Sequence, residues 1–411
     1  MKQLLMLLDH FPPAFAPRMG YLAKYLKDMG WDAVALHCPH PEINTGFEHL
    51  AKYIENYNID IKHLFKNHTI NRFLSEFYGL TKFRHLWSLD DEAMYKKTQE
   101  ILKCRHFDAI ICSTASFFPL NCASRIAKET KLPMLIDLRD IYEQNTNLLS
   151  TNTLSRLLHK RQIVRRNKIL ANAAAVTTVS SWHKNFLSQF NNNTSLVFNG
   201  FDENIFVFPK AIETKKFTIT YTGSITLNGE DSQRSPELLF QAVSEQQNKQ
   251  NVSTENICIR FFTNEQSFPL IKHLAKKYNV ENVETHGRVA AVEVPQLLYN
   301  SNILLLLASE KNTRGVLTTK LFEYMASNRE ILCIPNSGGE IEHLLTQSQA
   351  GCCINTLPEL CAYLKFKYNE WQKKHYVEPH TDRLFAENFS RERQAMQFVN
   401  ILNNIIKTNN L

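Results

Sequence analysis

The sequence predicts an α/β protein made of two doubly wound domains, each with a parallel sheet covered by helices on both faces. The chain has 411 residues. Domains of roughly 200 residues each are common, so this length fits two of them. Short apolar runs typical of buried parallel strands alternate with helical patterns along most of the chain. Several runs end in polar or glycine-containing turns, where open parallel sheets bind ligands.

The composition is that of an ordinary globular protein, with 44% hydrophobic residues. Its nine cysteines are scattered apart from the pair Cys352–Cys353, which favours buried thiols over a disulfide framework. No CxxC motif or Cys/His cluster has zinc spacing, so we expect no metal site. A net charge of +7 weakly favours anionic partners and decides little by itself.

The first domain opens with a β-α-β unit: a strand over Lys2–Leu8, a helix over Arg18–Met29 and a strand over Trp31–His37. The apolar run Leu4–Leu8 is too short for a signal peptide or a membrane span, so we expect a cytoplasmic protein. Arg18 is a candidate contact for a phosphate or an anionic acceptor. The alternative is an exposed arginine at a helix end that binds nothing.

From about residue 59 to residue 103 the alternation stops, and a basic helical insertion is expected. Between Ile61 and Trp87 lysines and arginines are interleaved with histidines and aromatic residues. This mixture favours contact with an anionic membrane surface or a lipid-linked acceptor. A core-packed helix pair is the alternative. Nucleic acid ranks lower, because no nucleic-acid motif accompanies the segment.

Polar side chains follow the next two predicted strands of the first domain. Asp108–Cys112 leads into Ser113, a candidate for the acceptor or phosphate side. Met134–Ile136 ends in the sequence DLRD, residues 137–140. Asp140 is the candidate contact for an acceptor hydroxyl or a sugar, with Arg139 for charge balance. A salt-bridged strand terminus is the alternative interpretation.

The first domain closes with a basic helix over Leu154–Ala173, a strand over Ala175–Val179 and a helix that begins at Trp182. The turn Asn199-Gly200 then provides the tight backbone that a hinge requires. We expect the linker to the second domain at about residues 203–215.

The second domain begins with a strand over Phe217–Thr222 that runs into Gly223-Ser224. Backbone N–H groups in such a turn can bind a phosphate. Arg234, at the start of the next helix, is a candidate phosphate cation. A strand over Ile257–Phe262 follows, and Val283 leads into a loop containing His286, Gly287 and Arg288.

The most informative stretch runs from Leu304 to Glu342. It predicts a strand over Ile303–Leu307, a helix over Thr319–Ser327, a strand over Glu330–Ile334 and a helix that opens after Gly338-Gly339. Lys320 and Glu323 are three residues apart, so both point to one side of their helix. A cation and a carboxylate there suit the phosphates and ribose hydroxyls of a nucleotide-sugar. A surface ion pair is the alternative.

The segment GVLTTKLFEYMASNREILCI, residues 315–334, resembles the donor-binding signature of family 4 glycosyltransferases, which are retaining enzymes of the GT-B type. The resemblance implies that Glu323 holds the ribose hydroxyls, that Lys320 serves the diphosphate and that Leu317, Thr318 and Thr319 border the donor. Gly315 departs from the family, which usually has glutamate there. A subset with the KLFEY form does without it.

The resemblance covers most of the chain and implies two domains that face each other across a cleft, followed by a helix that crosses back to the first domain. Residues 1–205 would bind the acceptor and residues 206–385 the donor. The last part, residues 386–411, would cross back to the first domain as a helix, whose periodicity runs over Phe385–Leu402. It also assigns Gly223, Ser224, Arg234, Gly287, Arg288, Gly338 and Gly339 to donor binding.

The expected function is transfer of a hexose from a UDP- or GDP-linked donor to a saccharide or lipid-linked acceptor, with retention, in bacterial cell-surface polysaccharide or glycolipid synthesis. Asp140, Arg139 and Lys320 are the candidate catalytic residues. Positioning and stabilisation of the leaving diphosphate would lower the barrier. No metal or other cofactor is expected, since no DxD-like carboxylate cluster accompanies these residues.

Two other functions stay open from the sequence. A nucleotide-sugar 2-epimerase of the same fold would need a carboxylate acid and base near the sugar. A catalytically silent binding subunit is favoured by Gly315, whereas the presence of Lys320 and Glu323 argues against it.

Overall fold

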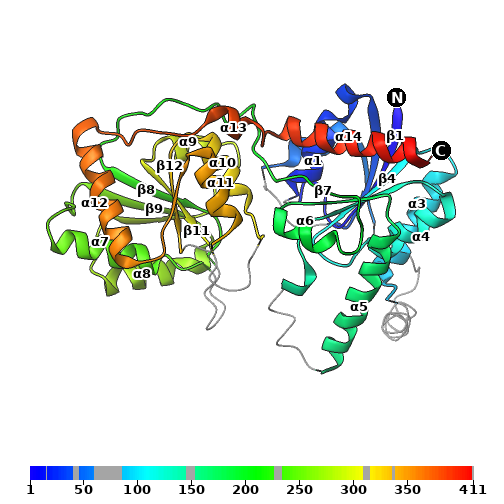
Figure 1. Cartoon of the computed structure of the whole chain (residues 1–411), viewed down its shortest axis with the longest axis horizontal. Helices are drawn as coiled ribbons and strands as arrows, with labels where there is room; N and C mark the ends of the chain where they lie inside the picture. Colours follow the sequence, from blue (N-terminus) through cyan, green and yellow to red (C-terminus); the bar gives the residue numbers. More distant parts are fainter. Residues whose placement is uncertain are drawn as a thin grey trace. The chain divides into compact units, whose positions relative to one another are not determined.

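The structure is a computed structural model that describes residues 1–14, 16–39, 46–59, 86–144, 153–225, 234–308, 315–335 and 338–409. The chain forms two compact units (Figure 1). The first unit comprises Met1–Phe198 and Arg391–Leu411, and the second comprises Asn199–Ser390. The chain therefore returns to the first unit for its last helix.

The first unit is built on a seven-stranded sheet with the order β3-β2-β1-β4-β5-β6-β7. Every neighbouring pair is parallel. The strands are β1 (Lys2–Leu8), β2 (Trp31–His37), β3 (Glu55–Asn58), β4 (Ala109–Thr114), β5 (Met134–Leu138), β6 (Ala175–Thr178) and β7 (Thr194–Leu196).

Helices cover both faces of this sheet (Figure 1). The α-helices are α1 (Pro17–Leu26), α3 (Leu89–Leu102), α4 (Leu120–Thr130), α5 (Thr153–Ala171), α6 (Ser181–Leu187) and α14 (Arg391–Asn409). Short 3-10 helices occur at Lys27–Met29, Glu48–Tyr53 and Tyr142–Gln144.

The side chains of β1 show that helices pack against both faces of the sheet. Side chains alternate between the faces of a strand. Leu4 and Met6 belong to a core cluster with residues of α1 and α14, whereas Leu5 and Leu7 belong to another with residues of α3 and α4. Both faces are buried, so the strand is an uninterrupted apolar run, as expected for parallel sheets.

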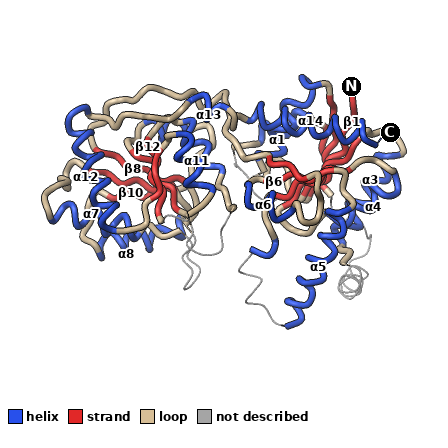
Figure 2. The backbone as a smooth tube through the Cα atoms, in the orientation of Figure 1, coloured by secondary structure: helices blue, strands red, loops and turns tan. Residues whose placement is uncertain are grey.

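The second unit has a six-stranded sheet with the order β10-β9-β8-β11-β12-β13, again parallel throughout. Figure 2 shows its strands enclosed by helices. The strands are β8 (Phe217–Thr222), β9 (Ile257–Phe262), β10 (Val283–His286), β11 (Ile303–Leu307), β12 (Glu330–Ile334) and β13 (Gly351–Cys353). The helices are α7 (Glu237–Asn248), α8 (Phe268–Lys277), α9 (Val294–Tyr299), α10 (Thr319–Ala326), α11 (Glu340–Ser348), α12 (Leu357–Lys374) and α13 (Arg383–Glu387), with a 3-10 turn at Glu265–Ser267.

Both sheets reverse their strand order once, and this locates their ligand-binding edges. In the first unit the reversal lies between β1 and β4, and in the second between β8 and β11. Open α/β sheets bind ligands outside the carboxyl ends of the strands at such a switch point. The predicted fold class, two doubly wound α/β domains, is confirmed.

The predicted continuous helix over Phe385–Leu402 is wrong, because the chain breaks between α13 and α14. Phe201 N–H donates to the Phe389 carbonyl at 3.1 Å, and Phe201 bridges Ser390 in parallel. Gly200 allows this approach, since a Cβ there would lie 2.1 Å from the Phe389 oxygen. A backbone contact between distant segments interrupts a pattern that is helical locally.

The edge strand β3 was not anticipated, because its sequence, ENYN, contains no apolar run. Within the predicted basic insertion, α3 is helical, but its first turn is acidic, with Asp90, Asp91 and Glu92. The membrane hypothesis for residues between Ile61 and Trp87 falls almost wholly outside the described residues. In the part of the chain that is described, no helix has the length and apolarity needed to cross a membrane.

Candidate functional site

A cluster of cations lies at the switch point of the second unit. Lys320, in the first turn of α10, directs its Nζ over the Tyr221 ring, 4.9 Å from the ring centroid and 3.4 Å from the hydroxyl oxygen. Tyr221 donates its own O–H to the Ser224 carbonyl at 2.8 Å. Arg288 Nη2 donates to Ser224 Oγ at 2.8 Å. We call Lys320, Arg234 and Arg288, together with Tyr221, Gly223 and Ser224, the cation site.

The pKa of Lys320 is affected by burial and by the two arginines of this site. Burial, with the charges of Arg234 and Arg288, lowers the pKa of Lys320 to about 7, against the opposing charge of Glu323. Arg234 also hydrogen-bonds Tyr221, although burial still raises the pKa of that phenol to about 12. Repulsion among the cations exceeds the attraction of the nearby carboxylate, so an anionic ligand would stabilise the site.

The turn after β8 needs glycine at position 223. Gly223 has φ +126, which side-chain-bearing residues rarely adopt, and a Cβ there would lie 1.8 Å from Lys320 Nζ. The ammonium group therefore rests directly against the backbone of this turn. The structure brings the predicted residues Gly223, Ser224, Arg234 and Lys320 together. Their role in donor binding stays a prediction.

Helix α10 is held against β8 by a residue that sequence reasoning missed. Tyr324 is completely buried, and its hydroxyl oxygen accepts the Thr222 N–H at 3.0 Å. Tyr324 lies one turn after Lys320, so this bond helps to fix the register of the lysine. Its position four residues after Lys320, on an otherwise apolar helix face, is the signal that could have identified it.

Glu323 lies on α10 three residues after Lys320 and is partly exposed. The helix begins after Leu317 and Thr318. Thr318 is the N-cap without a side-chain capping bond, and Thr319 is the first helical residue. The N–H groups of the first turn of a helix have no intrahelical acceptors. This end of α10 can therefore offer donors to a ligand beside the cation site.

Gly315 has φ +81, in the left-handed region. A glutamate would be strained there, whereas glycine is not. The backbone thus gives a physical reason for the departure from the family pattern noted in the sequence.

The other predicted donor residues occupy loops at the same edge of the sheet. Gly338 and Gly339 have φ values of +55 and +129, with nothing within 4 Å of an added Cβ, and Gly339 caps α11. Gly287 follows β10, where the exposed His286 stacks on Phe262 at 4.7 Å between ring centroids. The carboxyl ends of β8, β10, β11 and β12 meet here because the strands are parallel.

In the first unit, the structure corrects two predictions. Arg18 is 3% exposed and pairs with the fully buried Asp137, with Nη2 2.9 Å from Oδ1. Arg18 also donates to the Val197 and Phe198 carbonyls. Ser113 donates to Asp137 Oδ2 at 2.8 Å. Both side chains therefore belong to an internal cluster, and neither is placed to contact a phosphate or an acceptor.

Asp137 is the centre of that cluster. Desolvation by burial raises its pKa, but the charge and hydrogen bonds of Arg18 and the hydroxyls of Ser113 and Thr177 outweigh it, so the pKa is lowered overall. A buried carboxylate fully supplied with donors is a structural element. The sequence analysis singled out Arg139 and Asp140 of the DLRD segment, whereas Asp137 lies within β5 and is completely buried.

Arg139 and Asp140 lie past the end of β5. Arg139 Nη2 is 2.6 Å from Asp9 Oδ2, and Asp9 also accepts the Ala115 N–H at 3.0 Å. Asp140 reaches solvent, yet partial desolvation by the surrounding protein raises its pKa; the charge of Arg139 opposes the rise and that of Asp9 adds to it. Asp9 was missed, although it directly follows the first buried strand. It places the Arg139 guanidinium at the switch point between β1 and β4.

Among the described residues, no three His, Cys, Asp or Glu side chains are grouped as metal ligands would be. Independence from metal stays a prediction.

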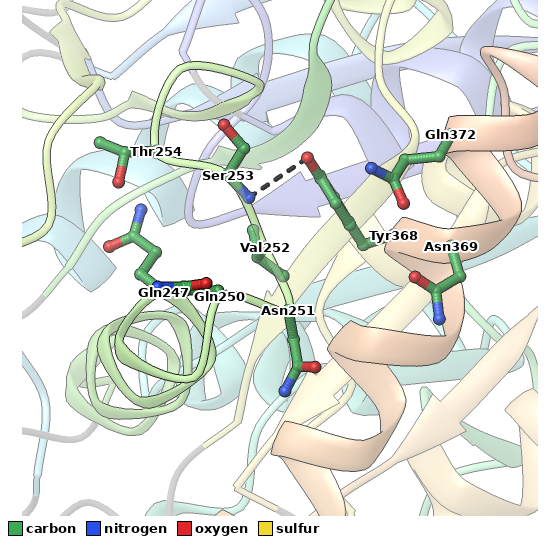
Figure 3. Close-up of a pocket in the computed structure, with 9 residues that line it drawn as sticks. All are labelled: Gln247, Gln250, Asn251, Val252, Ser253, Thr254, Tyr368, Asn369 and Gln372. Atoms are coloured by element: carbon green, nitrogen blue, oxygen red, sulfur yellow. Dashed lines mark hydrogen bonds between the residues drawn. The ribbon is translucent and has the colours of Figure 1, made fainter.

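Figure 3 shows a pocket of about 470 Å³ between the end of α7 and α12, where Ser253 N–H donates to the Tyr368 oxygen at 3.2 Å. The loop residues 250–254 that line this pocket come just before β9, so the pocket lies at the amino edge of the sheet. None of the predicted site residues lines it.

No family model matches the chain, and no curated protein sequence matches it. Solved structures do. Anabaena HepE in complex with UDP and glucose has a TM-score of 0.67 and 13% identity over 98% of this chain and 100% of that chain. Sucrose-phosphate synthase from Thermosynechococcus elongatus has a TM-score of 0.67 and 12% identity over 99% and 100%.

A glycosyltransferase from Rickettsia africae is similar at a TM-score of 0.65, with 14% identity over 99% of both chains. The expected GT-B fold is confirmed by these similarities. Sequence identities of 12–14% support a shared fold and nothing beyond it. Membership of family 4 and of its KLFEY-type subset stays a prediction.

Proposed function

We propose that this protein is a glycosyltransferase that takes its sugar from a nucleotide-sugar. The observation that carries the proposal is the cation site: Lys320, Arg234 and Arg288 converge on the turn Gly223-Ser224 at the switch point of the second sheet. A diphosphate is an anion of suitable size and charge for such a site. HepE, a protein of the same fold, was solved with UDP and glucose, and this supports a UDP-linked donor.

Each part of the donor has a candidate partner in the second unit. Lys320 and Arg234 would neutralise the diphosphate, and Arg288 would reinforce them. Glu323 would accept hydrogen bonds from the ribose hydroxyls. The backbone around Gly287 would border the base. The turn Gly338-Gly339 would offer a sugar or phosphate close access to the start of α11.

The chemical step would depend on charge at the leaving group. As the bond between the anomeric carbon and the diphosphate oxygen breaks, negative charge grows on the diphosphate, and the cation site stabilises it. A lysine with a pKa of about 7 in the empty site would become fully protonated beside that charge. We propose that the sugar is transferred with retention and without a metal ion.

The acceptor would bind to the first unit near Arg139 and Asp140. Asp9 holds the Arg139 guanidinium in place, while Asp140 has a raised pKa and reaches solvent. A carboxylate that reaches solvent can hold an acceptor hydroxyl by accepting its hydrogen bond. With retention, the acceptor oxygen would bond to the anomeric carbon on the face that the diphosphate leaves, and its proton would pass to the leaving diphosphate. A saccharide or lipid-linked acceptor, in the synthesis of bacterial cell-surface polysaccharide or glycolipid, fits the proposal.

A screen of UDP- and GDP-sugars for thermal stabilisation, followed by product analysis, tests the function. We expect one nucleotide-sugar to raise Tm and its sugar to appear on an added acceptor. Formation of an epimerised nucleotide-sugar without acceptor would instead indicate a 2-epimerase. Binding without any turnover across an acceptor panel would favour the silent binding subunit. No stabilisation by any nucleotide would contradict the proposal.

A further inference from the structure

Helix α5 of the first unit has an unusual charge distribution. It contains six lysines or arginines and no aspartate or glutamate in its 19 residues. One side is fixed to the unit: Gln162, Arg166, Ile169 and Leu170 are buried, and Arg166 pairs with Glu143 at 2.6 Å. The other five cations lie elsewhere on the helix.

The opposite side of α5 is exposed, and we call it the outer face. Two of its residues are aliphatic, Leu157 at 49% and Val164 at 55% exposure. Five exposed cations lie on the same side: Arg156, Lys160, Arg161, Arg165 and Lys168. Of the described side chains, the small exposed Ala171 also falls on this side, and the two aliphatic residues and five cations are the seven compared below.

The order of these residues around the helix is informative. At about 100° per residue, the seven side chains span an arc of roughly 180°. Leu157 and Val164, seven residues apart, fall near the middle of the arc. Arg156 and Lys160 lie on one flank, and Lys168, Arg161 and Arg165 lie on the other. The face therefore has an aliphatic centre with cations on both sides.

We propose that the outer face of α5 is a docking surface for an anionic phospholipid membrane. Helices that lie in a membrane interface bury aliphatic side chains just below the headgroups while flanking lysines and arginines meet lipid phosphates. A nucleic acid or another polyanion would use the cations but has no use for exposed Leu157 and Val164. The aliphatic centre therefore favours the membrane.

The position of α5 in its unit suits this role. Figure 1 shows its amino-terminal part extending beyond the sheet of the first unit. The helix is anchored by its buried side, so the outer face can meet a flat surface without rearrangement of the core. The proposal does not depend on the proposed function, but it would bring a lipid-linked acceptor near the enzyme.

The test is co-sedimentation of the full chain at low salt with vesicles of phosphatidylglycerol and phosphatidylcholine, and with phosphatidylcholine alone. We expect binding to the anionic vesicles only. The triple variant R156Q/K160Q/K168Q should bind about a hundredfold more weakly, since each cation near an anionic surface contributes about fivefold to partitioning. Arg165 is left intact because its Nε donates to Asn121 Oδ1 at 3.1 Å.

Two further variants separate a membrane face from general attraction. K27Q/K103Q/K128Q removes three exposed lysines of the same unit and lowers the net charge equally; it should bind vesicles nearly as well as the unmodified chain. L157S/V164S keeps every cation and should lose vesicle binding at least tenfold if the aliphatic centre enters the interface. Each variant should keep the Tm of the unmodified protein.

Three results would overturn the proposal. The unmodified protein could fail to bind anionic vesicles; K27Q/K103Q/K128Q could lose as much affinity as the α5 triple variant; or L157S/V164S could bind unchanged, which would indicate a site for any polyanion. Nucleotide binding is measured on the same samples. Loss of the proposed donor site would leave vesicle binding in place, so the two ideas fail separately.

Discussion

Nucleotide-sugar binding should weaken as the pH rises above 7, and Lys320 should be the cause. The pKa of Lys320 is about 7 in the empty site, lowered by burial and by Arg234 and Arg288. A bound diphosphate would raise this pKa, because it adds negative charge beside the ammonium group. Above pH 7 the empty protein must therefore take up a proton on binding, whereas below pH 7 the lysine is already charged.

The magnitude follows from linkage. Each pH unit above the pKa of the empty site weakens binding by about tenfold, or about 1.4 kcal/mol, until the pKa of the complex is reached. Between about pH 6 and about pH 8.5, the apparent Kd should rise about 30-fold. A nucleotide-sugar is the right probe, since its diphosphate carries no proton that titrates in this range.

The assay is isothermal titration calorimetry across this pH range, in two buffers with different ionisation enthalpies to count the protons taken up. Lys320→Met is the matched variant, because it keeps an unbranched side chain and removes the titrating group. Its Kd should be weak and independent of pH. A flat profile in the unmodified protein, or an equal slope in Lys320→Met, would refute the reasoning.

Three other changes test separate parts of the argument. Glu323→Ala should weaken binding of the nucleotide-sugar by about 10- to 150-fold, because it removes a charge-assisted hydrogen bond. The control Glu255→Ala, at an exposed position, should leave the Kd unchanged. Equal Kd values for the two variants would remove Glu323 from the site. Activity should survive EDTA, and loss on chelation that Mg²⁺ or Mn²⁺ restores would reveal a missed metal. Arg18→Met should lower the free energy of unfolding in urea by about 3–5 kcal/mol, since it leaves Asp137 charged and buried. Lys249→Met, which breaks the exposed pair of Lys249 with Glu245, should cost under about 1 kcal/mol. Similar costs for both changes would contradict the buried-pair assignment.

Much of the architecture could be predicted from the sequence because its causes are local. A strand buried on both faces must be apolar throughout, so Leu4–Leu8 and Ile303–Leu307 identified the central strands of both sheets. Lys320 and Glu323 were assigned to one side of a helix from their spacing alone. Gly223 was selected as a turn glycine, and its φ of +126 shows why.

Only the tertiary structure decided which distant residues meet. Arg18 and Asp137 are 119 positions apart, and Arg139 and Asp9 are 130 apart. Whether a polar residue after a strand faces the core or the ligand edge depends on its neighbours in the sheet, which no local pattern records. The strand order of the first sheet buries Arg18 and Ser113 beside Asp137, and that of the second sheet brings Arg288 to Ser224. The sequence by itself determined the buried central strands and the residue types available at their ends, because both depend on local pattern. Strand order and packing decided the edge strand β3, the break between α13 and α14 and which distant charges pair in the interior.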